Sequence, residues 1–387
     1  MIYLDYNAST PVHPKVMEKI LPYFQEDFAN ASSVHQLGQK ARKAVEDARA
    51  QLAQFIGADS PDEIIFTSGG TEANNMAIKG ALASSKKGKR IVSSAIEHSA
   101  VRTVLKHLAE EEKIDNVIVP VERNGIIGPD HVDDAITPDT ALVCIMAANN
   151  ELGTIQPIAE IAEICQKKQV PFLVDAIQLA GKKQIRVKEL GADFLSLSGH
   201  KFGGPKGVGI LYIKKGTRVH SLIEGGKQEK NRRGGTENVP GIVGMGAAAE
   251  IVSENLSAEA ARISWLRDLF EDLLLKSIPL SFVNGDKNQR ICNTSNICFP
   301  FTESSTALMA LDLKGIACSS GSACAAGSVD PSHVLLAIGL EKEQAHASLR
   351  FSLGHQTTEE QIREAVKIIT ETITKLRENH PLWKKGL

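Results

Sequence analysis

The sequence predicts an α/β fold, with a large domain built on a mainly parallel seven-stranded sheet and a smaller α+β domain. Two observations predict it. Short apolar runs alternate with helical patterns between residue 60 and about residue 215. After the helical stretch at residues 239–256 the pattern changes to a long helix followed by short strands. Such alternation is typical of a parallel sheet covered by helices on both faces. The 387 residues, 42% of them hydrophobic, suit a globular protein of two or three domains.

The expected strands of the sheet are apolar runs. In chain order they read "EIIFT", "RIVSSA", "NVIVPV", "ALVCIMAA", "VPFLVDA", "DFLSLS" and "VGILYI". Helical patterns fill the intervals, and the clearest are "EANNMAIKGALA", "SAVRTVLKHLAEEE" and "IAEIAEICQKKQ". We therefore place the large domain at residues 15–257 and assign residues 1–14 and 258–387 to the small domain.

Longer helices are predicted in the last third of the chain. "VPGIVGMGAAAEIVSENL" predicts a helix of small residues, and "SAEAARISWLRDLFEDLLLKSI" predicts a second long helix after it. Thr357 and Glu360 form a candidate capping box at the start of the C-terminal helix. The apolar stripe of that helix has alternating spacings of four and three and comprises Ile362, Val366, Ile369, Ile373 and Leu376.

Charge and composition exclude several classes of function. The net charge of −2 favours neither nucleic acid nor an anionic membrane as a partner. The start "MIYLDYNAST" is unlike a signal peptide, and no apolar segment approaches the length of a membrane span, so we expect a cytoplasmic protein. The six cysteines include no CxxC pair and no common zinc spacing, so we expect neither a disulfide framework nor a metal.

Polar residues follow several of the predicted strands. In open parallel sheets, ligands bind beyond the carboxyl ends of the strands. In "FTSGGTEANN", Gly69 and Gly70 allow a tight turn and Thr71 stands where a helix begins. The start of a helix is a ready phosphate site, but for this stretch taken alone a plain strand–helix turn capped by Thr71 is the better interpretation.

Two further strand ends carry charged residues. Asp175 and Gln178 occur in "LVDAIQ", and Ser198, His200 and Lys201 occur in "LSLSGHKFGGPKGVG". Asp175 alone is as consistent with a helix cap as with a carboxylate that faces a positive partner, and Lys201 alone is most simply a surface charge. Together they match pyridoxal 5'-phosphate, which needs an amine for its Schiff base, a carboxylate on its pyridinium nitrogen and a cradle for its phosphate.

Two more strand ends offer weaker candidates. Asn149 and Asn150 in "AANNELG" are either turn formers or neighbours of the cofactor's phenolic oxygen. His98 in "SSAIEHSA" is either a core histidine or a residue that stacks on the cofactor ring and handles protons.

Taken together, these residues resemble the cysteine desulfurase family, within the class V aminotransferase-like pyridoxal phosphate enzymes. The resemblance runs along nearly the whole chain, through "YLDYNASTP", "GGTEANN", "IEHSA", "NNELG", "VDAIQ", "SGHKFGGPKG", "RGGTENVP", "SSGSAC" and "RFSLG". It implies the type I fold of pyridoxal phosphate-dependent transferases, with L-cysteine as substrate. Selenocysteine lyase, or another class V aminotransferase, is the alternative.

The resemblance also implies roles at the cofactor. Lys201 binds it covalently, Asp175 pairs with its ring nitrogen, and Gln178 bonds its phenolic oxygen. His98 stacks on the ring and shuttles protons. The residues implied at the phosphate are Gly70, Thr71, Ser198 and His200, with Thr236 of "RGGTENVP" reaching it from a neighbouring subunit, so the resemblance implies a homodimer.

Three residues are implied at the substrate. Arg350 holds its carboxylate, with Asn150 beside it. Cys324, on the loop at about residues 315–330, attacks the substrate sulfur and keeps it as a persulfide for an acceptor protein that serves iron–sulfur cluster assembly or tRNA thiolation. A thiol on this Gly/Ala/Ser loop is expected to move between the two places. The additional Cys318 is a second sulfur carrier, a disulfide partner under oxidation, or a filler on the strand that enters the loop.

Overall fold

The computed structural model describes residues 1–321, 330–381 and 383. Its sheet has seven strands in the order β2-β8-β7-β6-β5-β3-β4. The strands are β2 (Ile64–Thr67), β3 (Arg90–Ser94), β4 (Asp115–Val119), β5 (Thr140–Met146), β6 (Phe172–Asp175), β7 (Phe194–Ser198) and β8 (Gly209–Ile213). β8 runs antiparallel to both of its neighbours, and the remaining pairs are parallel. The predicted mainly parallel seven-stranded sheet is therefore confirmed.

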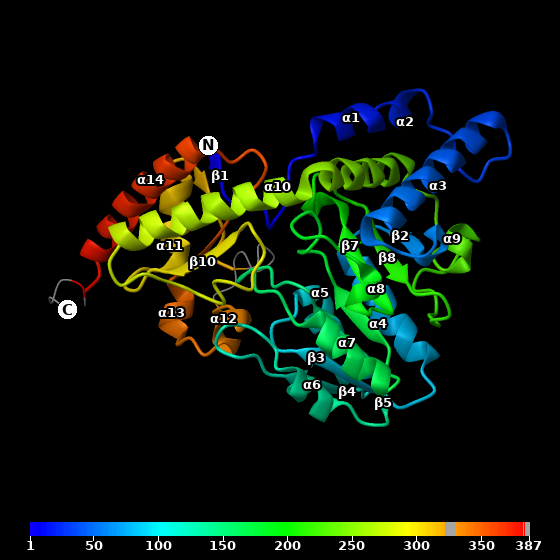
Figure 1. Ribbon diagram of the computed structural model, residues 1–387, viewed down its shortest axis with the longest axis horizontal. Coiled ribbons are helices and arrows are strands. Elements are labelled where there is room, and N and C mark those ends of the chain that lie inside the picture. The colour runs from blue at the N-terminus through cyan, green and yellow to red at the C-terminus, as the bar shows by residue number, and fades with distance from the viewer. Residues whose placement is uncertain (322–329, 382, 384–387) are drawn as a thin grey trace.

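Helices cover both faces of this sheet (Figure 1). The helices of this part of the chain are α1 (Pro14–Ile20), α2 (Pro22–Gln25), α3 (Gln36–Ile56), α4 (Gly70–Ser84), α5 (Ser99–Glu111), α6 (Pro129–Ala135), α7 (Ile158–Lys167), α8 (Val187–Leu190) and α9 (Gln228–Asn231). The strands are apolar throughout because both faces are buried. In β5, Val143 and Ile145 enter one core cluster while Leu142 and Cys144 enter the other.

A second, smaller part lies beside the sheet (Figure 1). β1 (Ile2–Tyr3) pairs with β11 (Ile316–Ala317), and β10 (Thr294–Cys298) pairs with both β9 (Phe282–Val283) and β12 (Ser348–Ser352). The accompanying helices are α11 (Ser304–Asp312), α12 (His333–Ala337), α13 (Lys342–His346) and α14 (Glu359–Glu378). A core cluster of its own, which includes Phe270 and Phe351, holds this part together. Among the described residues, no helix combines the length and the apolarity that crossing a bilayer requires.

One helix of 39 residues, α10 (Val239–Ser277), runs along both parts (Figure 1). The sequence predicts two helices here, and the structure instead joins them across a single non-helical residue, Asn255. The first half needs small residues because a Cβ on Gly246 would lie 2.9 Å from Cα of Ala48 in α3. The second half contributes Phe270 to the small core. The domain boundary at residue 257 falls inside this helix and stays a prediction.

The C-terminal helix α14 begins one residue later than the sequence pattern indicates. Its capping box is formed by Thr358 and Gln361 rather than by Thr357 and Glu360. Thr357 is buried, and its hydroxyl accepts a hydrogen bond from the backbone N–H of Gly354 instead. The predicted apolar stripe does face the core, since its first four members are buried and Leu376 packs against them.

Candidate active site

The carboxyl ends of the strands meet at one edge of the sheet. Asp175 at the end of β6 is level with Met146 of β5, and Ser198 at the end of β7 is level with Gly209 of β8. Gly209 is in turn level with Thr67 at the end of β2. The polar residues that follow these strands are therefore brought to the same edge, as the sequence predicts.

Asp175 is a buried carboxylate with fixed partners. It is 5% exposed, and its two oxygens accept hydrogen bonds from the Asn74 side-chain amide (2.7 Å) and the Ile177 backbone N–H (3.1 Å). Burial raises the pKa of Asp175, and the nearby His98 opposes that rise. A protonated pyridine nitrogen, such as that of pyridoxal phosphate, is the kind of partner that stabilises such a buried negative charge.

His98 caps the first turn of α5. Its Nδ1 accepts a hydrogen bond from the backbone N–H of Ala100 at 3.1 Å. Nδ1 is thus an acceptor, which assigns the proton of the neutral ring to Nε2. Burial lowers the pKa of His98, although Asp175 acts in the opposite direction. The ring is therefore a neutral N–H donor at physiological pH.

Lys201 lies in the turn Gly199–Lys201 that follows β7. Its Nζ donates to the backbone oxygens of Asn7 at 2.5 Å and Ala8 at 3.0 Å. The adjacent His200 has Nδ1 within 3.2 Å of the Ser9 hydroxyl. Burial and the charge of Lys201 lower the pKa of His200 to about 4, so this ring is neutral as well.

The start of α4 forms a cradle next to Ser198. A Cβ on Gly70 would lie 2.0 Å from Cδ1 of Ile177, so a larger residue here would displace the Ile177 side chain. A Cβ on Gly69 would lie 3.9 Å from the hydroxyl oxygen of Ser198. The first backbone N–H groups of a helix have no partner within it and attract phosphate. Thr71 lies in the first turn of α4, beside these N–H groups.

The small part contributes Arg350 from β12. Its side chain is 1% exposed and donates from Nη1 to the backbone oxygen of Asn150 at 3.1 Å. Nη2 donates to Asp5 at 2.7 Å. The buried Nε has no partner among the described residues, so this guanidinium retains a donor for a carboxylate.

One predicted residue remains apart from this cluster, and another is not described. Thr236 is exposed just before α10, and within the described part of the chain it forms no hydrogen bond with the other predicted site residues. Cys324 lies outside the described residues. Asn149 proves to be a turn former, because its side-chain oxygen accepts from the backbone N–H groups of Glu151 and Leu152.

Asn7 is central to the site, and the strand-end argument misses it. Its backbone oxygen accepts from both Lys201 and the side chain of Gln178. Its side-chain nitrogen donates to the backbone oxygen of Asn150 at 3.2 Å. The signal that points to Asn7 is the motif "YLDYNASTP", which no strand–helix pattern explains.

These residues fit pyridoxal phosphate. The edge holds an amine, a buried carboxylate and a helix start at Gly70 that packs closely on Ile177, and the orphaned side-chain oxygen of Asn74 lies beside the carboxylate. Lys201, Asp175 and the start of α4 are thus the residues that would hold the cofactor.

Comparisons with known proteins agree with this geometry. A cysteine desulfurase IscS of Dictyoglomus turgidum is 47% identical over 387 residues, covering 99% of this chain and 98% of the relative. A cysteine desulfurase IscS of Methanosarcina thermophila is 46% identical over 385 residues, covering 99% and 95%. A solved NifS-like protein aligns with a TM-score of 0.91 at 36% identity, covering 97% of this chain and 99% of that one.

A second solved structure, described as SspA in complex with cysteine, aligns with a TM-score of 0.81 at 36% identity. It covers 91% of this chain and 99% of its own. The family model of the class V aminotransferases matches residues 2–364. This chain therefore belongs to the class V aminotransferase family.

Proposed function

We propose that this chain is a cysteine desulfurase, which converts L-cysteine to L-alanine and transfers the sulfur to Cys324. One observation carries the proposal. The backbone oxygen of Asn7 binds the Lys201 amine, while the Asn7 side chain contacts the Asn150 carbonyl that also holds Arg350. Asn7 thus links the cofactor lysine, directly, to a carboxylate-binding arginine, through the Asn150 carbonyl.

The cofactor is pyridoxal 5'-phosphate, and when bound it withdraws electrons from the α-carbon of the substrate. Nζ of Lys201 is the base that takes the α-proton. The cofactor would bind to this atom, so the substrate that joins the cofactor lies next to it. Asp175 keeps the ring nitrogen protonated. The neutral His98 holds a proton at Nε2 for exchange with the substrate.

Arg350 binds the carboxylate of L-cysteine. Nη1 is fixed on the Asn150 carbonyl and Nη2 on Asp5, so the guanidinium is oriented before the substrate arrives. An arginine that is already oriented gives up little side-chain entropy on binding. Asn150 acts as the second residue at the substrate because its carbonyl sets this orientation.

Sulfur passes from the thiol of L-cysteine to the thiol of Cys324. The Cys324 thiolate attacks the sulfur of L-cysteine, an S–S bond forms, and the bond between sulfur and the β-carbon breaks. The β-carbon keeps the electron pair and takes a proton, which yields alanine and a persulfide on Cys324. An acceptor protein, in iron–sulfur cluster assembly or tRNA thiolation, then receives the outer sulfur.

Cys318, the second cysteine near the loop, is a poor nucleophile. Burial raises the pKa of its thiol well above the ordinary value, and the side chain packs against the small core. A thiol attacks sulfur as the thiolate, which this environment disfavours. This supports the interpretation of Cys318 as a filler rather than as a second carrier.

The assembly and location follow the same resemblance. We propose a cytoplasmic homodimer in which Thr236 of each subunit contacts the cofactor phosphate of the other. The exposure of Thr236, together with its lack of hydrogen bonds to the described cluster in its own chain, supports this arrangement.

The test supplies the holoenzyme with L-cysteine and dithiothreitol and measures alanine and sulfide. We expect equal amounts of both from the parent and from Cys318→Ser, and a loss of both from Cys324→Ser with the cofactor still bound. Undiminished sulfide release by Cys324→Ser would remove Cys324 from the mechanism. Consumption of cysteine without alanine would exclude the desulfurase.

A further inference from the structure

Lys182 is a buried lysine that none of the roles above explains. It follows β6 and is 9% exposed, whereas the adjacent Lys183 is exposed. Its Nζ donates to Oε1 of Gln178 at 3.2 Å. Burying an ammonium group costs free energy, so a chain that keeps one inside a protein gains something from it.

The contact determines which way the Gln178 amide faces. Of the two amide atoms, only the oxygen can accept a hydrogen bond from the donor Nζ. At the other end of the amide, Nε2 donates to the backbone oxygen of Asn7 at 3.0 Å. A flipped amide would place donor against donor at Lys182 and acceptor against acceptor at Asn7. Two independent partners therefore select the same orientation.

This orientation places the amide nitrogen at the same Asn7 oxygen that binds the cofactor lysine. The Asn7 oxygen that accepts from Gln178 also accepts from Nζ of Lys201 at 2.5 Å. Nε2 and the Lys201 amine thus converge on a single oxygen atom. Asn7 takes one of the two N–H groups that an amide nitrogen carries, and the second is available to the cofactor's phenolic oxygen.

We propose that Lys182 is a positioning residue that holds the Gln178 amide with Nε2 toward Lys201 and the phenolic oxygen of the cofactor. The inference rests on the proposed role of Gln178. Lys182 does not touch the reacting atoms in this arrangement. It acts through Gln178, by making one of the two amide orientations unfavourable.

The electrostatic surroundings agree with an unusual lysine. Burial, followed by the charges of Lys201 and Arg350, lowers the pKa of Lys182 to about 7. Lys182 donates an N–H to Gln178 whether it is charged or neutral. The orientation of the amide therefore persists on both sides of this pKa.

The test compares Lys182→Met with its exposed neighbour, Lys183→Met. The readouts are the dissociation constant of pyridoxal phosphate from the apoprotein, the pH midpoint of the bound cofactor's absorption change, and the melting temperature of the apoprotein. We expect Lys182→Met to weaken cofactor binding about fivefold, the effect of one hydrogen bond. It should also raise the midpoint, because the phenolic oxygen loses a donor. Lys183→Met should match the parent.

A double-mutant cycle separates positioning from general packing. Gln178→Ala alone should shift both readouts in the same direction as Lys182→Met and at least as far, and adding Lys182→Met to Gln178→Ala should cause no further loss. Methionine removes a buried ammonium, so we expect an apoprotein melting temperature that is equal or higher.

Three outcomes would overturn the inference. They are losses that add in the double variant, a Lys182→Met variant with the parent's affinity and midpoint, and a Gln178→Ala variant with no effect. The last outcome removes the role of Gln178 itself. Alanine formation by the parent decides the proposed function separately.

Discussion

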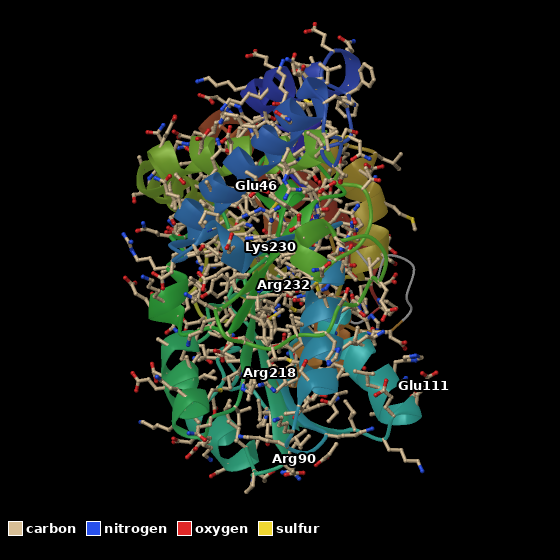
Figure 2. All side chains as sticks on the ribbon, turned by 90° about the vertical axis from the view of Figure 1, so that its right-hand side faces the viewer. Glu46, Arg90, Glu111, Arg218, Lys230 and Arg232 are labelled. Atoms are coloured by element: carbon tan, nitrogen blue, oxygen red, sulfur yellow. The ribbon has the colours of Figure 1, made fainter. Side chains whose placement is uncertain are left out.

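The charged side chains at the two ends of the seven-stranded sheet differ in their exposure to water. At the carboxyl end, Asp175 and Lys182 are buried and His98 is half-buried, and each has a shifted pKa. At the amino end, charged side chains form ion pairs in contact with water, and Figure 2 shows one of them, Arg90, near the rim of the large part. The pairs are Arg90–Asp115, Lys168–Asp133 and Lys214–Asp193.

The difference lies in what holds each charge. Lys214 is 53% exposed, so water and salt screen its pair with Asp193 and leave it little net energy. The buried groups instead depend on fixed protein partners, an arrangement typical of functional sites. A hollow of about 750 Å³ opens at the amino end, lined in part by Lys86, Asp193 and Lys214. Volume alone therefore does not mark the site.

The largest contrast is expected between two lysines. Lys201→Ala should lower alanine formation by about a thousandfold, because the base and the attachment point of the cofactor are lost together. Lys214→Ala, at the other end of the sheet, should leave the rate unchanged. Alanine assays and the visible absorption of both variants check this. Equal losses in the two variants would abolish the distinction between the ends.

The two ends also predict different effects for two aspartates. Asp175→Asn should reduce kcat about a hundredfold, because a neutral amide no longer stabilises a protonated ring nitrogen. Asp193→Asn should stay within about twofold of the parent, because this half-buried side chain lies at the opposite end of the sheet, where it binds Lys214 and the backbone N–H of Phe172. Steady-state kinetics on both variants makes the comparison. A kcat near the parent value for Asp175→Asn would contradict the role of Asp175.

Conservative arginine variants sharpen the contrast further. Arg350→Lys should raise KM for L-cysteine about tenfold and change kcat less, because lysine lacks the planar fork that binds a carboxylate. Arg90→Lys at the amino end should alter neither constant. Initial rates over a range of cysteine concentrations measure both. A loss confined to kcat in Arg350→Lys would argue against carboxylate binding.

The last contrast concerns stability and pH. Glu97, beside His98, is buried, and burial raises its pKa to about 8. Because the folded state holds this proton more tightly than the unfolded state, the contribution of Glu97 to stability is complete near pH 4. It falls as the pH rises toward 8, by up to about 1.4 kcal/mol per pH unit. Glu97→Gln should remove this slope.

Urea unfolding of the apoprotein at pH 5 and at pH 8 measures the effect. The exposed Glu111, labelled in Figure 2, provides the matched control, since Glu111→Gln should follow the parent. Parallel pH dependence of Glu97→Gln and the parent would show that Glu97 does not titrate as a buried group.

The sequence predicts strand ends better than it predicts burial. Asp175 and Lys201 are found because each follows an apolar run, and the parallel register then brings them to one edge. Lys182 and Lys183 are indistinguishable by pattern, and tertiary packing alone buries the first. The capping box slips by one residue for a similar reason, because adjacent threonines compete and Thr357 is engaged by Gly354.

The most direct test of the central claim locates the cofactor on one of two lysines at the carboxyl end of the sheet. Borohydride reduction of the holoenzyme fixes the cofactor to its amine, and mass spectrometry of the digested protein then identifies the modified residue. The account predicts modification of Lys201 and an unmodified Lys182. A pyridoxyl group on Lys182, or on a lysine at the amino end of the sheet, would contradict it.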